Sequence, residues 1–151
     1  MLEELRSAEP YASVACGQAL PYPPPSRRRC DLWLGEPLEW AIEIKMARFF
    51  GDNGKKDDTA IKDLLSPYDD DRSALTDTVK LAGSQLPARK AIVIYGFENE
   101  KRQLEPAITA FETLARELVT LGERQQASMG PLVHLVHLGG AVFGWEVTPR
   151  S

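Results

Sequence analysis

The segment from residue 39 to residue 49, EWAIEIKMARF, mixes hydrophobic and polar positions in the way a β-strand does. Successive side chains of a strand point to opposite faces, so every second residue shares a face. One face of this predicted strand is apolar and carries Trp40, Ile42, Ile44 and Met46. The other face carries Ala41, Glu43 and Lys45, which places a carboxylate and an amine side by side.

Three further strands are predicted from apolar runs. Residues 30–34 form a short strand that ends at Gly35, and Pro37 marks the turn that follows. Because the connection to residue 39 is short, as in hairpins, we expect the two strands to be antiparallel neighbours. Residues 12–20 predict a weak strand, and residues 90–98 predict a continuous apolar strand that is buried on both faces.

The helical pattern, with apolar residues three and four positions apart, recurs four times. The segments are residues 1–7, 59–66, 69–82 and 105–121. We expect Asp57 or Asp58 to cap the second helix and an aspartate of residues 69–71 to cap the third. The apolar stripe of the third is predicted to be Leu75, Val79 and Ala82. That of the fourth is Ile108, Phe111, Ala115, Leu118 and Leu121, with Gly122 closing the helix.

The end of the chain, residues 131–147, holds two apolar segments on either side of Gly139 and Gly140, which act as a turn signal. This stretch predicts either a hairpin or one bent strand. His134 and His137 are three positions apart, so on a regular strand they lie on opposite faces and are poor co-ligands. A structural role is the expected one for both.

These elements predict an α/β (α+β) domain in which helices flank a mixed β-sheet. The chain has 151 residues, which suits a single domain over residues 1–151, and its 43% hydrophobic and 26% charged residues exclude general disorder. The net charge of −4 counts mildly against nucleic-acid binding, although local charge placement can override it.

Several classes of protein are not expected. No apolar run approaches the roughly 20 residues that a membrane-spanning helix needs. Cys16 and Cys30 lack CxxC spacing and fit the reduced thiols of a cytoplasmic protein better than a disulfide framework or a zinc site. The loop GDNGKKDD at residues 51–58 lacks the spacing of a phosphate-binding P-loop, and we expect no organic cofactor.

The chemistry of the chain concentrates at Asp31, Glu43 and Lys45. If the two predicted strands pair, all three side chains can meet on one face of the sheet. Two carboxylates supply the oxygen ligands of a hard divalent cation, and Mg²⁺ commonly takes only one or two of them. A lysine beside the cation can orient a water molecule and stabilise charge on a phosphate. Metal-assisted hydrolysis of a phosphodiester requires these groups.

Asp31, eleven intervening residues and then Glu43-Ile44-Lys45 resemble the signature of the PD-(D/E)XK nuclease superfamily, which has the restriction-endonuclease-like fold. That fold runs helix, three-stranded meander, helix, strand, with the acid and the E-x-K on adjacent strands. The resemblance covers about residues 1–97, with 104–147 as an extension. It implies that Asp31 and Glu43 hold Mg²⁺ or Mn²⁺, assisted by the Ile44 carbonyl, and that Lys45 is the catalytic lysine.

The chain departs from this pattern in two places. Cys30 stands where the motif has proline, and the first helix, which in many members supplies another glutamate, is very short. The candidates for that glutamate are Glu3, Glu4 and Glu9. The bare motif is also frequent by chance, and the alternative reading of Glu43 and Lys45 is a surface ion pair on a half-exposed strand.

Basic residues near the motif are candidates for binding the DNA backbone. They are Arg27, Arg28, Arg29, Arg48, Lys55 and Lys56, for which a solvated surface is the alternative. Lys80, on the helix after the E-x-K strand, is a secondary candidate, although an ordinary exposed lysine that pairs with Asp77 or Thr76 is the more expected reading. The three aspartates at 69–71 are explained by helix capping at least as well as by metal binding.

Three hypotheses therefore compete. The first is a Mg²⁺-dependent nuclease that hydrolyses DNA, with a homodimer favoured if the substrate is duplex. The second is a non-catalytic nuclease-fold domain that binds nucleic acid or a protein partner. The third is an unrelated α/β protein in which the pairing of Glu43 with Lys45 is incidental, and there Asp31 would lie far from Glu43.

Overall fold

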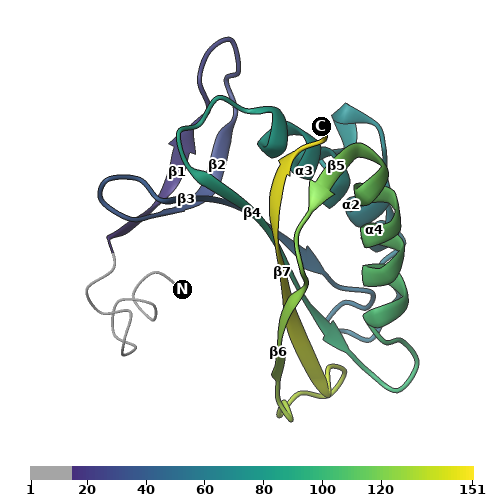
Figure 1. Ribbon diagram of the computed structural model, residues 1–151. Helices are drawn as coiled ribbons and strands as arrows, with labels where there is room; N and C mark the ends of the chain where they lie inside the picture. Colours follow the sequence, from purple (N-terminus) through teal and green to yellow (C-terminus); the bar gives the residue numbers. More distant parts are fainter. Residues whose placement is uncertain (1–14) are drawn as a thin grey trace.

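The computed structural model describes residues 15–151 and has a mixed α+β architecture (Figure 1). A seven-stranded mixed sheet runs through the molecule, and the three α-helices lie together on one side of it. Its path has the strand order β1-β2-β3-β4-β7-β5, with β6 pairing beside β5 on β7. The predicted combination of a mixed sheet and helices is confirmed, and the α-helices within residues 15–151 cover one face of the sheet. The helix expected over residues 1–7 lies outside the described residues.

The first three strands form an antiparallel meander. They are β1 (Cys16–Pro21), β2 (Arg29–Leu34) and β3 (Trp40–Ala47). The predicted β2–β3 hairpin is confirmed, because Leu34 pairs with Trp40 across a short turn at Gly35, whose φ of 95° suits glycine. The chain then crosses over through α2 (Ala60–Leu65) and α3 (Ala74–Gly83), and β4 (Arg89–Glu98) joins β3 in parallel.

The C-terminal third differs from the prediction. Helix α4 (Glu105–Leu118) ends three residues early, because residues Val119–Leu121 become strand β5. Strand β7 (Gly139–Pro149) pairs with β4 and begins at the two glycines, which therefore do not form a hairpin turn. Its hairpin partner is β6 (Gln125–Met129), a mostly exposed and polar strand without an apolar pattern that sequence reasoning could detect.

Two helix starts also differ from expectation. Ser73 rather than an aspartate caps α3, since its hydroxyl accepts the Thr76 N–H at 3.1 Å, and the three aspartates form the short 3-10 helix η2 (Asp69–Asp71). Thr59 occupies the N-cap position of α2, and Asp57 instead accepts the N–H and hydroxyl of Thr59. Val79 is 40% exposed, so it is not part of the buried stripe of α3.

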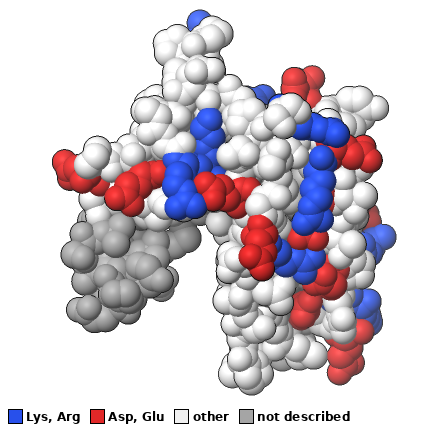
Figure 2. All heavy atoms as spheres, viewed as in Figure 1, with Lys and Arg blue, Asp and Glu red and all other residues white. Residues whose placement is uncertain are grey.

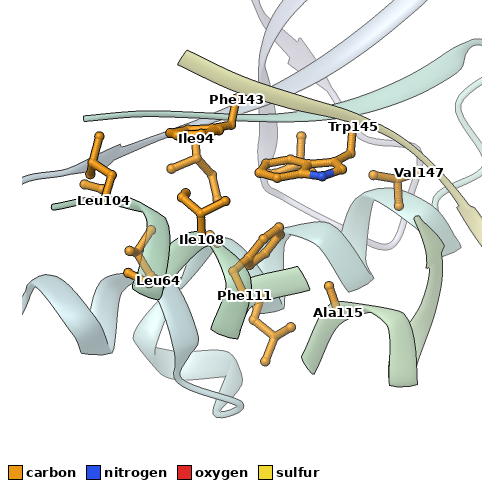
Figure 3. Close-up of a cluster of buried hydrophobic side chains, with 14 of the residues drawn as sticks. Leu64, Ile94, Leu104, Ile108, Phe111, Ala115, Phe143, Trp145 and Val147 are labelled. Carbon is orange, nitrogen blue, oxygen red and sulfur yellow. The ribbon is translucent and has the colours of Figure 1, made fainter. Parts of the chain in front are cut away.

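The hydrophobic core lies between the helices and the β4–β7 half of the sheet (Figure 3). Ile94 and Phe143 project from the sheet toward Ile108 of α4, and Phe111 lies against the Trp145 ring with 5.3 Å between ring centroids. Full burial of such side chains contributes about 1.5–3 kcal/mol each relative to exposure. The core therefore holds β4 and β7 against the helices. Strand β3, which pairs with β4, lies at the edge of this core.

The buried face of strand β3 is the one that carries Glu43, and the apolar face is the more exposed one. Ala41, Glu43 and Ala47 are buried, whereas the face with Trp40 and Ile42 is half-buried and Met46 is 42% exposed. Helix α3 causes this, because its Leu81 packs on Ala41 and so covers the face that carries the carboxylate. Likewise β4 is fully buried on one face only.

Among residues 15–151, no helix is long and apolar enough to cross a membrane.

Candidate functional site

The sheet opens at Asp31. The β2–β3 ladder pairs Leu34 with Trp40 and reaches Leu32 opposite Ile42, and the regular register ends there. Beyond that point the Asp31 carboxylate enters the ladder, and its Oδ2 accepts the Ile44 backbone N–H at 2.8 Å. A side chain thus replaces a backbone acceptor, and the two strands part beside Glu43.

Strand β1 is irregular at the same level. Gln18 pairs with Leu32 and Leu20 pairs with Cys30, but Ala19, between them, adopts a left-handed φ of 56°. Such a conformation costs a non-glycine residue about 1–2 kcal/mol and is concentrated at functional sites. The Arg29 guanidinium donates to the Ala19 carbonyl at 3.0 Å and holds this bend. Strand β1 is therefore bent, and the β2–β3 ladder is interrupted, around Asp31.

Glu43 is a buried carboxylate with partners from three elements. Only 2% of it is exposed, and its Oε1 accepts the Tyr22 hydroxyl at 2.5 Å and the Lys80 ammonium at 2.8 Å. Burial, together with the contact from the Asp31 carboxyl group, raises the pKa of Glu43 from 4.5 to about 7, against the lowering effect of Lys80 and Tyr22. Asp31 and Glu43 thus line the same cleft, and the Asp31 carboxyl group influences the pKa of Glu43.

Lys45 takes a different place from the one expected beside the carboxylate pair. Its ammonium contacts Asp77 Oδ2 at 2.7 Å and donates to the Arg72 carbonyl at 2.6 Å. The lysine beside Glu43 is Lys80, which also pairs with Asp77 Oδ1 at 2.9 Å. Lys80 is therefore no ordinary exposed lysine: hydrogen bonds with Glu43 and Asp77 outweigh the effect of burial and raise its pKa.

Helix α3 supplies this second half of the site. Asp77 and Lys80 are three positions apart, so they lie on one helical face and reach the same region of β3. The Ser73 cap fixes the start of the helix, and Leu81, which is buried in one cluster with Ala41, turns this face toward β3. Asp77 lies between the two lysines and fixes both ammonium groups.

A cleft of about 450 Å³ joins these groups. It is lined by Arg27, Arg28, Arg29, Asp31, Glu43, Ile44, Lys45, Arg72, Asp77 and Lys80. Six of these ten side chains are basic and three are acidic, in a chain whose net charge is −4. On the face of the molecule drawn in Figure 2, basic and acidic side chains are interspersed rather than collected into one broad basic surface. The positive charge of the cleft is therefore local.

The structure gathers most, but not all, of the predicted site residues. The three arginines at 27–29 line the cleft beside Asp31. Arg48 and Lys56 do not, since they pair with Asp52 and Asp58 at 3.7 Å, and Lys55 is exposed in the same distant loop. Glu3, Glu4 and Glu9 lie outside the described residues.

Sequence reasoning missed Tyr22, Arg72 and the positioning role of Asp77. Tyr22 lies in the proline-rich stretch after β1, which has no periodicity, and only the fold brings it to Glu43, 21 positions away. Arg72 enters through the left-handed turn after η2, where its φ is 48°. The three-residue spacing of Asp77 and Lys80 was the one available sequence signal for this part of the site. It predicted that these two residues pair, but not that they contact Glu43 and Lys45 on β3.

The two histidines disagree with the prediction of opposite faces on a strand. Residues 130–138 form a loop, in which the rings of His134 and His137 stack with 4.8 Å between centroids. His134 Nδ1 accepts the backbone N–H groups of Val136 and His137 at 3.1 Å, which ties the loop together. That nitrogen is thus an acceptor within the loop, in keeping with a structural role.

The carboxylate pair has the chemistry of a hard-cation site of low ligand count. Within residues 15–151, no group of three or more His, Cys, Asp and Glu side chains is arranged to hold a metal ion. Mg²⁺ does not require such a group, because it commonly binds one or two carboxylates and keeps several water molecules. Exposed Asp31 and buried Glu43 supply two oxygen-bearing groups in contact, one of which opens to the cleft. Carboxylate oxygens of this kind are ligands that Mg²⁺ or Mn²⁺ takes in proteins.

Comparison of the chain with protein-family models, with curated proteins and with solved structures finds no match.

Proposed function

We propose that the protein is a Mg²⁺-dependent nuclease that hydrolyses phosphodiester bonds of DNA in the cleft between β2, β3 and α3. The observation that carries the proposal is that Asp31 and Glu43 line one cleft where the sheet opens, together with a local surplus of basic side chains. A pair of acids in contact is costly unless a proton or a cation lies with them.

The fold supports the same reading. The order of a three-stranded meander, a helical crossover and a parallel fourth strand resembles that of the restriction-endonuclease-like fold after its first helix, with Asp31 and Glu43 on adjacent strands. We therefore place the protein, as a proposal, with the PD-(D/E)XK nucleases and their Mg²⁺-dependent chemistry.

Each residue of the cleft would have a distinct task in hydrolysis. Bound Mg²⁺, held by Asp31, Glu43 and the Ile44 carbonyl, would polarise the phosphate and acidify a water molecule. The water oxygen would form a bond to phosphorus and release a proton to solvent, while the bond to the leaving oxygen breaks and that oxygen takes up a proton from solvent. Lys45, fixed by Asp77 and the Arg72 carbonyl, orients the water and stabilises the charge that grows on the phosphate.

Plasmid nicking tests this function. Purified protein should nick or linearise supercoiled DNA with Mg²⁺ or Mn²⁺, and Glu43→Ala and Lys45→Ala should abolish cleavage. Matched controls are Glu36→Ala, at an exposed acid in the β2–β3 turn, and Lys101→Ala, at an exposed lysine beyond β4; both should cut like wild type. Cleavage that persists in Glu43→Ala would remove the proposal.

One observation favours the alternative, a non-catalytic domain that binds nucleic acid or a protein partner. Lys80 and Lys45 neutralise Glu43 and Asp77 within the protein, so the acids already have counter-ions. If those ion pairs are the whole purpose of the cluster, Mn²⁺ should not bind at millimolar concentration. A titration in which Mn²⁺ binds wild type but not Asp31→Asn would decide for the catalytic reading.

A further inference from the structure

We infer that the cleft takes one unpaired DNA strand, with a base stacked on Tyr68, rather than a duplex. The inference rests on the proposed nuclease function and specifies its substrate. It comes from three features of the cleft rim formed by residues 68–72: an exposed aromatic ring, a rigid backbone beneath it, and the distribution of charge around it.

Tyr68 is the only exposed aromatic residue among residues 15–151, and 72% of it is accessible. An aromatic ring left in solvent needs no explanation by itself, but it has the shape and chemistry of a base-stacking platform. Every base has a π face, so stacking favours strands whose bases are unpaired and free to turn outward.

The backbone segment that carries Tyr68 borders the cleft. Asp69, the next residue, accepts the Arg28 guanidinium on its backbone oxygen at 3.4 Å, and Arg28 lines the cleft. At the other end of the rim, Arg72 lines the cleft as well, and its carbonyl holds Lys45. A strand whose phosphates lie on Arg28 and Arg72 therefore passes along the segment that carries Tyr68.

The rim is held in place before any ligand arrives. The Tyr68 carbonyl accepts the Asp71 N–H at 3.0 Å, and the Ser66 hydroxyl bonds to both the Tyr68 N–H and the Asp71 carboxylate. Lys62 contacts the same carboxylate at 2.8 Å. A platform that is already ordered loses little entropy when a base stacks on it.

Charge around the rim disfavours a second strand. Arg27, Arg28 and Arg29 line the cleft in one run of the chain, whereas Asp69 and Asp70 are exposed on the rim segment between Tyr68 and Arg72. A duplex would bring its second phosphate backbone toward these acids, and like charges repel. A single strand needs only the basic residues that line the cleft, and one copy of the chain is enough to bind it.

Fluorescence anisotropy tests the inference in Ca²⁺, with a labelled oligothymidine of 12 residues and a hairpin duplex of equal length as probes. The single strand should bind more tightly than the duplex. Tyr68→Ala should weaken its binding about tenfold, since stacking contributes about 1–3 kcal/mol per base, and Tyr68→Phe should bind within twofold of wild type. Leu118→Ala, at an exposed apolar residue of α4, is the matched control and should bind like wild type.

Equal or tighter binding of the duplex, or unchanged binding by Tyr68→Ala, would overturn the inference. The cleavage assay keeps the two proposals apart. Glu43-dependent cutting of duplex but not of single strands would refute the strand preference and leave the nuclease function standing. Tyr68-dependent binding of single strands without cleavage in Mg²⁺ or Mn²⁺ would support the strand preference and refute the nuclease function.

Discussion

Replacing Glu43 with glutamine should stabilise the protein at neutral and alkaline pH, although the change removes one partner of a buried ion pair. The pKa of Glu43 is raised from 4.5 to about 7, chiefly by burial. A raised carboxyl pKa means that the folded state holds the proton more tightly than the unfolded chain does. The stabilising contribution of that proton is therefore complete below pH 4.5 and is lost as the pH rises through 7.

The size of the effect follows from the same values. A pKa difference of one unit corresponds to about 1.4 kcal/mol, so the rise from 4.5 to about 7 corresponds to roughly 3 kcal/mol. Glutamine is neutral at every pH and keeps an oxygen that accepts from Tyr22 and Lys80. Glu43→Gln should thus exceed wild type by up to about 3 kcal/mol above pH 8, with the difference vanishing near pH 4.5.

Urea unfolding followed by tryptophan fluorescence between pH 4.5 and 9, in the presence of a chelator, measures this difference. Glu112→Gln is the matched control, because Glu112 is also buried but its pKa is lowered, mainly by the hydrogen bonds from Arg124. That variant should be less stable than wild type at neutral pH, and its deficit should shrink in acid. A Glu43→Gln variant less stable than wild type at pH 8.5 would refute our description of the site.

Three other consequences can be measured. Binding of Mn²⁺ should release a proton below pH 7 and tighten as the pH rises to 7, because the ion requires ionised Glu43. Calorimetry in buffers of different ionisation enthalpy detects the released proton, and binding that does not depend on pH would contradict the prediction. Asp77→Asn should slow DNA cleavage at least about tenfold with little change in DNA affinity, since Asp77 positions both lysines, and an unchanged rate would exclude that role. Gly96→Ala should destabilise by about 2 kcal/mol or more in chemical denaturation, because its Cβ would lie 2.5 Å from the Ala47 carbonyl oxygen, whereas Gly83→Ala has open space and should be neutral or slightly stabilising.

The hairpin that carries the two acids could be predicted because its signals are local. A short apolar run, a turn marked by Gly35 and Pro37, and a second alternating run define the pair of strands without help from the rest of the chain. Strand pairing then brings Asp31 close to Glu43. This part of the site needed no knowledge of the tertiary structure.

The direction in which Glu43 faces could not be predicted in the same way. Alternation along β3 separates two faces but does not say which of them a helix will cover. That choice depends on the packing of Leu81 on Ala41, a contact between segments 40 positions apart. Tyr22 and Lys80 reach Glu43 through the same long-range packing, so the buried setting of the carboxylate becomes visible only in the fold.

The strands on the far edge of the sheet, β5 and β6, could not be predicted for another reason. Strand β6 is almost entirely exposed, so its residues carry no apolar period. Strand β5 continues directly from α4, and Leu121 fits the helical spacing as well as it fits a strand. Here the pairing with β7 decides the conformation, and the local sequence permits either.

A crystal of the protein soaked in Mn²⁺ and measured at the manganese absorption edge tests the central claim most directly. We predict an anomalous peak between the Asp31 and Glu43 carboxylates, with the Lys80 ammonium displaced from Glu43 Oε1. Density that leaves the Lys80–Glu43 contact intact, with no peak between the two acids at millimolar Mn²⁺, would contradict the claim that these carboxylates form a cation site.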